Sequence, residues 1–287
     1  IKVVEQIEIK NPLNENCTGK IPSISWKNEQ FTNSENITDE WGIFPSGVLL
    51  DVKNHFVWFS EQYQPGLYKM TVDGQWLRRL RPTEGMRRAF RNHSVNGGLT
   101  GIDFTADGRI VTVIGKCLDE NRNSDDLTSE INFALRRIAI VNFENNSDLS
   151  MFYFVENEDF DGIPPKHITL GDIAAVNDTS FLVTEYGYYN GISRNLLYMA
   201  TTSDSTTKAV VGLEGIEGKT FETLTPDDWR FNGLQEMKKI LIMDLSAYNV
   251  KHPDGLTIIN SEQIAIIDNN NFGIENGDAN SGSYDLD

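Results

Sequence analysis

The feature that most constrains the fold of this chain is a repeated hairpin pattern, which is most complete at residues 251–273. It consists of a glycine, an apolar run, a polar turn, a second apolar run and an Asp/Asn cluster closed by Phe-Gly. Weaker copies begin at Gly47, Gly101 and Gly171, with short runs rich in Val, Ile, Phe and Tyr between Asp-Gly, Asn-Gly or Asn-Asp turns. Such runs and turns are typical of β-hairpins and not of helices.

Repeats of roughly 40 to 70 residues with about four strands each predict an all-β fold, a β-propeller of four-stranded antiparallel blades. The alternative is a sandwich or barrel of similar hairpins, but sandwiches rarely repeat one turn signature so regularly. We expect one domain over residues 1–273, followed by a Gly/Asn/Asp-rich tail over residues 274–287. We expect about five or six blades, with the ring incomplete in this chain.

The charge balance is strongly acidic, with 25 Lys and Arg against 42 Asp and Glu and a net charge of −17. A surface of this kind repels nucleic acid and anionic membranes, and no apolar run approaches the length of a membrane span. Metal binding is a second explanation of the acidic excess, and solubility is the commoner one. The sequence begins without Met or a signal peptide, as expected of a processed or partial chain.

The cysteines and glycosylation sequons favour an extracellular protein. Cys17 and Cys117 allow one disulfide and no zinc site, and we predict that they pair. The Asn-x-Ser/Thr sequons begin at Asn16, Asn36, Asn92, Asn145 and Asn177. Asn36, Asn145 and Asn177 lie in predicted turns, where a glycan can be carried. We therefore predict a secreted glycoprotein.

Seven stretches of the chain carry a further signal: Pro45–Asp51, Val57–Pro65, Leu67–Arg79, Gly98–Asp103, Met243–Ser246, Asp254–Leu256 and Asp268–Gly273. They resemble the motifs of the phytase-like family, named for the esterase-like activity of phytase, and the resemblance covers residues 7–273. Members of the family usually have a further blade before this region and further strands after it. Because a propeller must close its ring, either the chain is a fragment or another segment completes it.

The resemblance implies acidic residues at blade starts and strand ends, where carboxylates from several blades converge on one central mouth. Such carboxylates can bind Ca²⁺ or act as acid and base on a phosphoester or ester. The chain departs from this pattern, since Ser46 and Thr100 replace expected Glu residues, and Asn269 and Asn271 replace expected carboxylates. The remaining catalytic candidates are Glu61, Asp254 and Asp268, and the remaining candidate metal ligands are Asp103, Asp172, Glu185 and Asp268. The alternative is that these residues bond to nearby backbone amides and stabilise turns.

A basic region stands out in this acidic chain: Arg78, Arg79, Arg81, Arg87, Arg88 and Arg91. Arginine forks suit phosphate or carboxylate recognition, so the region could bind an anion or an acidic partner surface, and intramolecular ion pairing is the alternative.

The replacement of expected acidic residues favours a non-catalytic structural or binding module of an extracellular assembly. Its partners would be other protein subunits or glycans. The alternative function is a Ca²⁺-assisted phosphoesterase or esterase. A third is a carbohydrate or peptide binder that uses Trp58, Trp76 and Tyr63, although aromatics on strands usually pack between blades. Fold resemblance alone does not decide between these functions.

Overall fold

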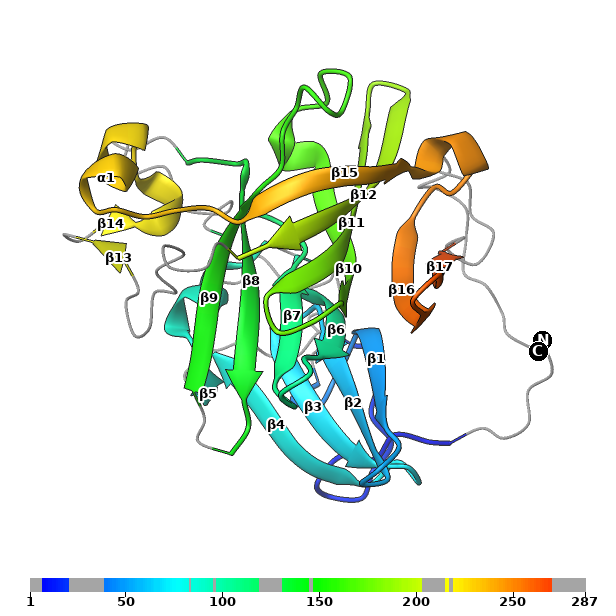
Figure 1. Cartoon of the computed structure of the whole chain (residues 1–287). Coiled ribbons are helices and arrows are strands. Elements are labelled where there is room, and N and C mark those ends of the chain that lie inside the picture. Colours follow the sequence, from blue (N-terminus) through cyan, green and yellow to red (C-terminus); the bar gives the residue numbers. More distant parts are fainter. Residues whose placement is uncertain are drawn as a thin grey trace.

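The chain folds into a mostly β structure, as predicted, with several four-stranded antiparallel sheets (Figure 1). The computed structural model describes residues 7–20, 39–82, 84–94, 97–118, 131–144, 147–202, 215–216 and 219–269. Within these ranges the only α-helix is the short α1 (Pro226–Phe231). None of the described helices has the length and apolar character needed to cross a membrane.

The first sheet is an antiparallel meander to which a short parallel strand is added. Its hairpins follow the turn chemistry of the sequence: the turn between β3 and β4 contains Asp73 and Gly74, and Gly74 has a φ of 85°, which glycine adopts without strain. The strands are β1 (Pro45–Asp51), β2 (Phe56–Glu61), β3 (Gly66–Thr71), β4 (Trp76–Pro82) and β5 (Gly85–Met86). The 3₁₀ helix η1 (Arg88–Asn92) follows.

The second and third sheets each contain four antiparallel strands and carry most of the core. The second sheet consists of β6 (Leu99–Phe104), β7 (Ile110–Ile114), β8 (Leu135–Asn142) and β9 (Ser147–Phe154). The third consists of β10 (Ile168–Ala175), β11 (Ser180–Tyr189), β12 (Ile192–Thr201) and β15 (Lys238–Asp244). All five residues of β7 are buried, which explains why its apolar run shows no alternation.

An insertion between β12 and β15 lies to one side of the molecule in Figure 1 and packs on the second sheet. It contains β13 (Gly215–Ile216), β14 (Lys219–Thr220), the 3₁₀ helix η3 (Phe221–Thr223) and α1. Thr225 and Asp228 form a capping box at the start of α1. Phe221 and Trp229 pack against Phe152 of β9, with ring centroids 4.9 and 4.8 Å away.

The fourth sheet is a two-stranded hairpin of β16 (Pro253–Asn260) and β17 (Gln263–Asp268), at the opposite side of Figure 1. Two further 3₁₀ helices each lie before the first strand of a sheet: η2 (Pro165–His167) leads into β10, and η4 (Leu245–Tyr248) lies between β15 and β16. The apolar face of the hairpin, with Leu256 and Ile266, packs on Leu182 and Leu197 of the third sheet.

Apart from the small β13–β14 sheet of the insertion, the four described sheets pack face to face in the order of the sequence. One apolar cluster joins the first and second sheets through Trp58 and Ile102, and another joins the second and third through Tyr153 and Val183. The first strands of successive sheets also contact one another: β1 lies beside β6, β6 beside β10, and β10 beside β16. The first strand of each sheet therefore lies beside the first strand of the next sheet.

Candidate functional site

The first strands meet at a repeated irregularity, which we call the inter-sheet junction. In each of β1, β6, β10 and β16 the pairing with the second strand shifts register near its start. The residues at these shifts are Ser46 and Gly47, Thr100 and Gly101, Gly171 and Asp172, and Asp254 with Gly255 beside it. Aligning the repeats by their glycines is therefore wrong by one position in the third sheet. There Gly171 takes the place of Ser46, and Asp172 takes the place of a glycine.

Missing side chains allow the first strands to approach one another closely. A Cβ atom on Gly101 would lie 2.6 Å from the backbone nitrogen of Ile173, and one on Gly171 would lie 2.4 Å from the carbonyl oxygen of Pro253. Real Cβ atoms do not approach backbone so closely, so glycine is needed at both positions for steric reasons.

Within the inter-sheet junction, side-chain hydroxyl groups hydrogen-bond each sheet to the next. Ser60 Oγ donates to the Thr100 carbonyl at 3.1 Å, and Thr100 Oγ1 donates to the Leu170 carbonyl at 2.9 Å. Thr184 Oγ1 donates to the Pro253 carbonyl at 2.7 Å. Ser46 and Thr100 were identified from the sequence as replacements for acidic residues, and Thr100 here makes an inter-sheet contact.

Asp172 is the carboxylate at the centre of the junction. It accepts hydrogen bonds from the backbone amides of Ile173 and Leu256 at 2.8 and 2.7 Å, and from the amide of Ile102. These amides belong to the third, fourth and second sheets. Burial raises the pKa of Asp172 to about 7, against the lowering effect of the three amides.

Asp103, one residue after Ile102 on β6, also links the second sheet to the third. Its carboxylate accepts the Ala175 amide of the third sheet and the Phe104 amide, both at 2.8 Å. Burial raises its pKa, and its charge adds to the raised pKa of Asp172. Two predicted metal ligands therefore lie near each other, with backbone donors on both.

Glu61 ends β2 and is fully buried. Its carboxylate accepts the backbone amides of Phe44, Tyr63 and Gln64 at 2.8, 2.9 and 2.5 Å. Burial raises its pKa to about 7, while the amides and Arg79 act in the opposite direction. The side chain thus holds together the segment that enters β1 and the segment that leaves β2.

Asp268 has the corresponding position at the end of β17. It accepts the backbone amides of Lys251 and His252 at 2.9 and 2.6 Å, in the segment that leads into β16. Asp254 accepts the Asn269 side-chain amide at 2.9 Å and the Tyr186 hydroxyl, and burial raises its pKa. The His252 ring lies edge-on to Tyr186, 5.3 Å between centroids. Asp254 and Asp268 are therefore near each other, whereas Glu61 belongs to the first sheet.

Glu185 ends a network that sequence reasoning did not identify. Its Oε1 atom accepts the Tyr153 hydroxyl and is 3.0 Å from Lys239 Nζ. The ammonium of Lys239 lies over the Tyr198 ring, 4.2 Å from its centroid, and Tyr198 donates to Asp159. Burial raises the pKa of Glu185, and Lys239 opposes this. The network joins β9 of the second sheet to β11, β12 and β15 of the third.

The predicted metal ligands Asp103, Asp172, Glu185 and Asp268 thus have separate hydrogen-bond partners. Over the described ranges, no group of three or more His, Cys, Asp or Glu side chains has a metal-binding arrangement.

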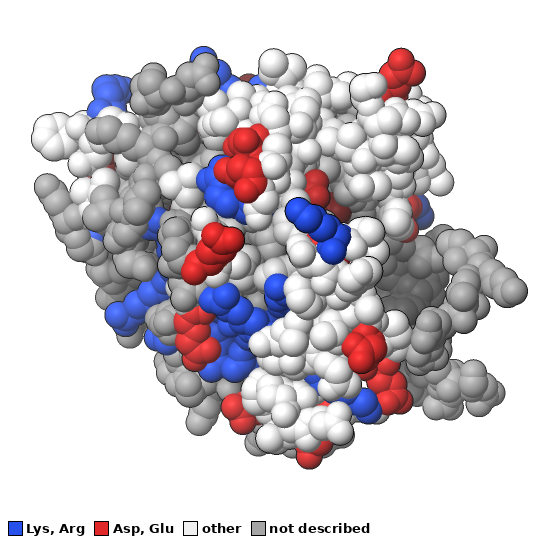
Figure 2. All heavy atoms as spheres, turned by 60° about the horizontal axis from the view of Figure 1, so that its bottom comes forward, with Lys and Arg blue, Asp and Glu red and all other residues white. Residues whose placement is uncertain are grey.

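Figure 2 shows a face on which Lys and Arg side chains gather next to Asp and Glu side chains. The arginines of the basic region have different surroundings. Arg81 forms a two-pronged pair with Glu84 at 2.7 Å, as the intramolecular alternative predicts. Arg79 lies over the ring of Trp41, 4.7 Å from its centroid, and Arg78 donates to the Phe143 carbonyl at 2.9 Å. Arg87 is buried, Arg91 is half-buried and Arg88 is exposed. The six arginines therefore differ in burial and in their contacts, and they do not form one uniform basic surface.

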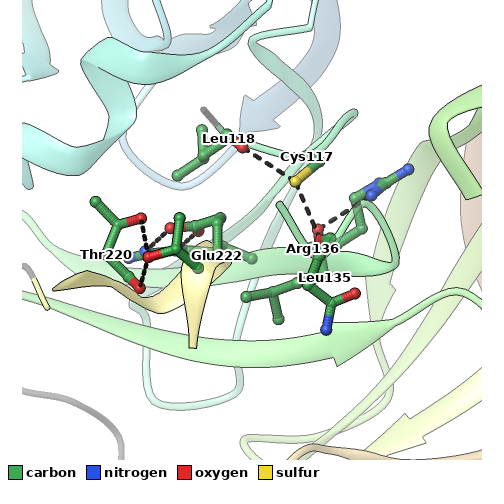
Figure 3. Close-up of polar contacts among 9 residues, drawn as sticks. Cys117, Leu118, Leu135, Arg136, Thr220 and Glu222 are labelled. Carbon is green, nitrogen blue, oxygen red and sulfur yellow. Dashed lines mark hydrogen bonds and ion pairs between the residues drawn. The ribbon is translucent and has the colours of Figure 1, made fainter. Parts of the chain in front are cut away.

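The predicted disulfide between Cys17 and Cys117 is wrong. Cys17 packs beside Ile43 and Phe59 of the first sheet, and burial raises its pKa to about 11. The buried thiol of Cys117 donates instead to the carbonyls of Leu118 and Asn132 at 3.0 and 3.4 Å (Figure 3). The two cysteines are thus held in different parts of the core.

The sequons at Asn16, Asn92 and Asn177 have exposed asparagines. The Asn177 side chain accepts the amide and hydroxyl of Thr179 at 2.9 and 3.1 Å, in the predicted turn. Asn36 and Asn145 lie outside the described residues.

Comparison with known families gives one match. A family model described as phytase-like, with esterase-like activity of phytase, matches residues 39–272. The match begins later than the resemblance noted from residue 7 and includes the whole inter-sheet junction. No curated protein matches the chain.

Proposed function

The chain belongs to the phytase-like family, which its family model matches over residues 39–272, and from this premise we propose that it is a β-propeller with a structural or binding role and no hydrolytic one. The single observation that carries the proposal is the use of the candidate carboxylates. Glu61, Asp172 and Asp268 each accept two or three backbone amides, within one sheet or between sheets.

The propeller architecture is supported by the order and contacts of the sheets. Successive first strands lie side by side, and the same register shift recurs in all four. Sheets that radiate from one axis bring their first strands together in this way. The described part of the fourth sheet, β16 and β17, continues this arrangement beside the third sheet.

The carboxylates are poorly placed for acid–base chemistry on a substrate. A general acid or base needs a lone pair or proton directed at the reacting atoms. In Glu61 and Asp172 the carboxylate oxygens are buried and face amide donors. Their raised pKa values follow from this burial and are explained without catalysis.

The proposed calcium ligands do not fit one shared site. Calcium requires six to eight oxygen ligands around one ion. The oxygens of Asp103 and Asp172 are taken by backbone amides, and Glu185 already neutralises the ammonium of Lys239. No step of the proposed function involves calcium.

A secreted, glycosylated state is part of the proposal. It is supported by the exposed asparagines of the sequons at Asn16, Asn92 and Asn177. In an extracellular assembly, partners would be other protein subunits or glycans.

The test is hydrolysis of p-nitrophenyl phosphate and p-nitrophenyl acetate by the purified chain, with millimolar CaCl₂ or EDTA. We expect no turnover above the buffer rate. We also expect the same melting temperature with either additive, because only a ligand that binds the folded state stabilises it. Hydrolysis that Asp254→Asn or Asp268→Asn abolishes would refute the proposal. So would a calcium-dependent rise in melting temperature that Asp268→Asn removes.

A further inference from the structure

The outer strand of the third sheet exposes an unusual run of apolar residues. Among the described residues β15 pairs with β12 alone and is the last strand of its sheet. Four consecutive residues, Ile240, Leu241, Ile242 and Met243, are 68, 47, 49 and 36% exposed. Edge strands usually carry charges or proline, which prevent them from pairing with other chains. On β15 the charged residues are confined to the two ends of the strand, Lys238 and Lys239 at one end and Asp244 at the other.

The fourth sheet presents a second apolar edge. Among the described residues β17 pairs with β16 alone, whereas the second and third sheets have four strands each. No charged residue occurs from Gln263 to Ile267, and Ile267 is 69% exposed. A two-stranded sheet has little stability of its own and gains from a further strand.

An irregularity limits which part of β15 can pair. Its register with β12 shifts between Leu197 and Tyr198, which leaves Ile242 as an extra residue on β15. Bulges of this kind interrupt pairing. The regular part of β15 is therefore Lys238–Leu241.

We propose that the outer edge of β15 in one copy of this chain pairs antiparallel with the outer edge of β17 in a second copy. In the register that places Lys238 opposite Asp268, Ile240 lies opposite Ile266 and Leu241 opposite Ala265. The ion pair and the apolar pairs then agree on one register. Cross-strand pairs of both kinds stabilise a sheet.

Like-with-like pairing of these edges is less favourable. With Ala265 at the centre of a β17–β17 ladder, Glu262 of each copy lies opposite Asp268 of the other, and like charges repel. In a β15–β15 ladder over the regular part, Lys238 lies opposite Leu241 and no ion pair forms. Charge complementarity therefore favours the pairing of two different edges.

Each copy carries both edges, so the contact is heterologous and leaves one free edge of each kind. Such contacts build open chains unless their rotation closes a ring. The net charge of −17 opposes assembly, and salt screens this repulsion. Association should therefore strengthen as ionic strength rises.

This inference rests on the assembly role proposed above and names a partner for it, a second copy of the chain. The experiment is sedimentation velocity of the full chain over a range of concentrations, at low and high NaCl. The test variants are Ile240→Lys on β15 and Ile267→Lys on β17. Val52→Lys is the matched control, because Val52 is 71% exposed and lies outside both edges.

The wild type and the control should grow beyond dimers as concentration and salt increase. Each test variant should associate roughly tenfold more weakly. In the proposed register Ile240→Lys places an ammonium opposite Ile266, and Ile267→Lys places one opposite the ammonium of Lys239, so the first loses an apolar pair and the second gains a like-charge pair. A mixture of the two variants should form dimers and nothing larger, because each variant retains the edge that the other has lost.

A wild type that stays monomeric at high concentration and salt would overturn the inference, as expected if another segment of the same polypeptide already pairs with β17. Mixed variants that stay monomeric would overturn it too, and so would variants that associate like the wild type. Hydrolysis assays on the same samples keep the two proposals apart. Turnover would refute the non-catalytic role without changing the sedimentation result.

Discussion

The carboxylate of Asp172 accepts the backbone amide of Leu256 at 2.7 Å and thereby joins the first strand of the third sheet to the first strand of the fourth. The same carboxylate accepts the amides of Ile173 and Ile102. It therefore contacts backbone from three sheets where the equivalent residue of the other sheets is a glycine.

Replacing Asp172 by alanine should destabilise the fold strongly. The change leaves three buried amides without their acceptor, and each such loss costs about 1 to 3 kcal/mol. We expect a loss of roughly 3 kcal/mol or more in the free energy of unfolding, measured by urea denaturation. Asp73→Ala, in an exposed turn, is the control and should change stability little. Equal stability of both variants would contradict the role given to Asp172.

Stability should fall as the pH rises through neutrality. Glu61 and Asp172 have folded-state pKa values raised to about 7, above the ordinary carboxyl values that apply to the unfolded chain. The folded protein thus binds more protons than the unfolded chain between about pH 4 and 7. This contribution to stability is fully present below the unfolded pKa values and is lost as the pH rises through 7.

The measurement is the melting temperature from pH 5.5 to pH 8, in the wild type and in Glu61→Gln. The variant removes one of the two titrating groups, so its melting temperature should depend less on pH. Acidic net charge also destabilises the fold at high pH, but it affects both proteins almost equally. A wild-type melting temperature that rises with pH would contradict the raised pKa values.

The buried ion pair between Arg137 and Glu222 should be costly to break. Its two bonds are 2.7 and 2.8 Å long, and the side chains are 1 and 2% exposed. Glu222→Ala leaves a buried guanidinium without its counter-charge and should cost about 3 to 5 kcal/mol in unfolding free energy. The double variant Arg137→Met with Glu222→Leu should lose less than the single one, because no charge remains to be desolvated. A double variant that is less stable than Glu222→Ala would contradict this explanation.

The hairpins could be predicted because their signals are local. The Asp73-Gly74 turn, for example, lies between apolar runs that became β3 and β4. The register of strand pairing is harder to predict from the sequence, because several glycines lie near the start of each repeat. The sequence aligned Gly171 with Gly47, and the hydrogen-bonded register moves it by one residue. Asp172 was expected to be a metal ligand that follows the repeat glycine. In the structure it occupies the position of that glycine, and its carboxylate links three sheets.

The positions of the site residues could be predicted only in part. Glu61 and Asp268 do lie at strand ends, as the repeat indicates, whereas Glu185 lies in the middle of β11. Their partners depend on tertiary contacts: Glu185 meets Tyr153 and Lys239, which are 32 and 54 residues away. The disulfide prediction is wrong for the same reason, since cysteine content says nothing of which part of the core each thiol enters.

The last prediction concerns Thr184, whose hydroxyl connects the third and fourth sheets. Thr184 is fully buried; its Oγ1 accepts the Asp172 amide at 2.8 Å and donates to the Pro253 carbonyl at 2.7 Å. Thr184→Val keeps the size of the side chain but leaves a buried donor and a buried acceptor unpaired. We expect a loss of roughly 2 to 4 kcal/mol in unfolding free energy. Thr184→Ser keeps the hydroxyl and should lose only about 1 kcal/mol, for one buried methyl group. Hydrogen exchange distinguishes this local effect from general loosening, because the Asp172 amide should lose protection in the valine variant and keep it in the serine variant. Equal losses of stability and protection in the two variants would mean that the hydroxyl does not hold the sheets together.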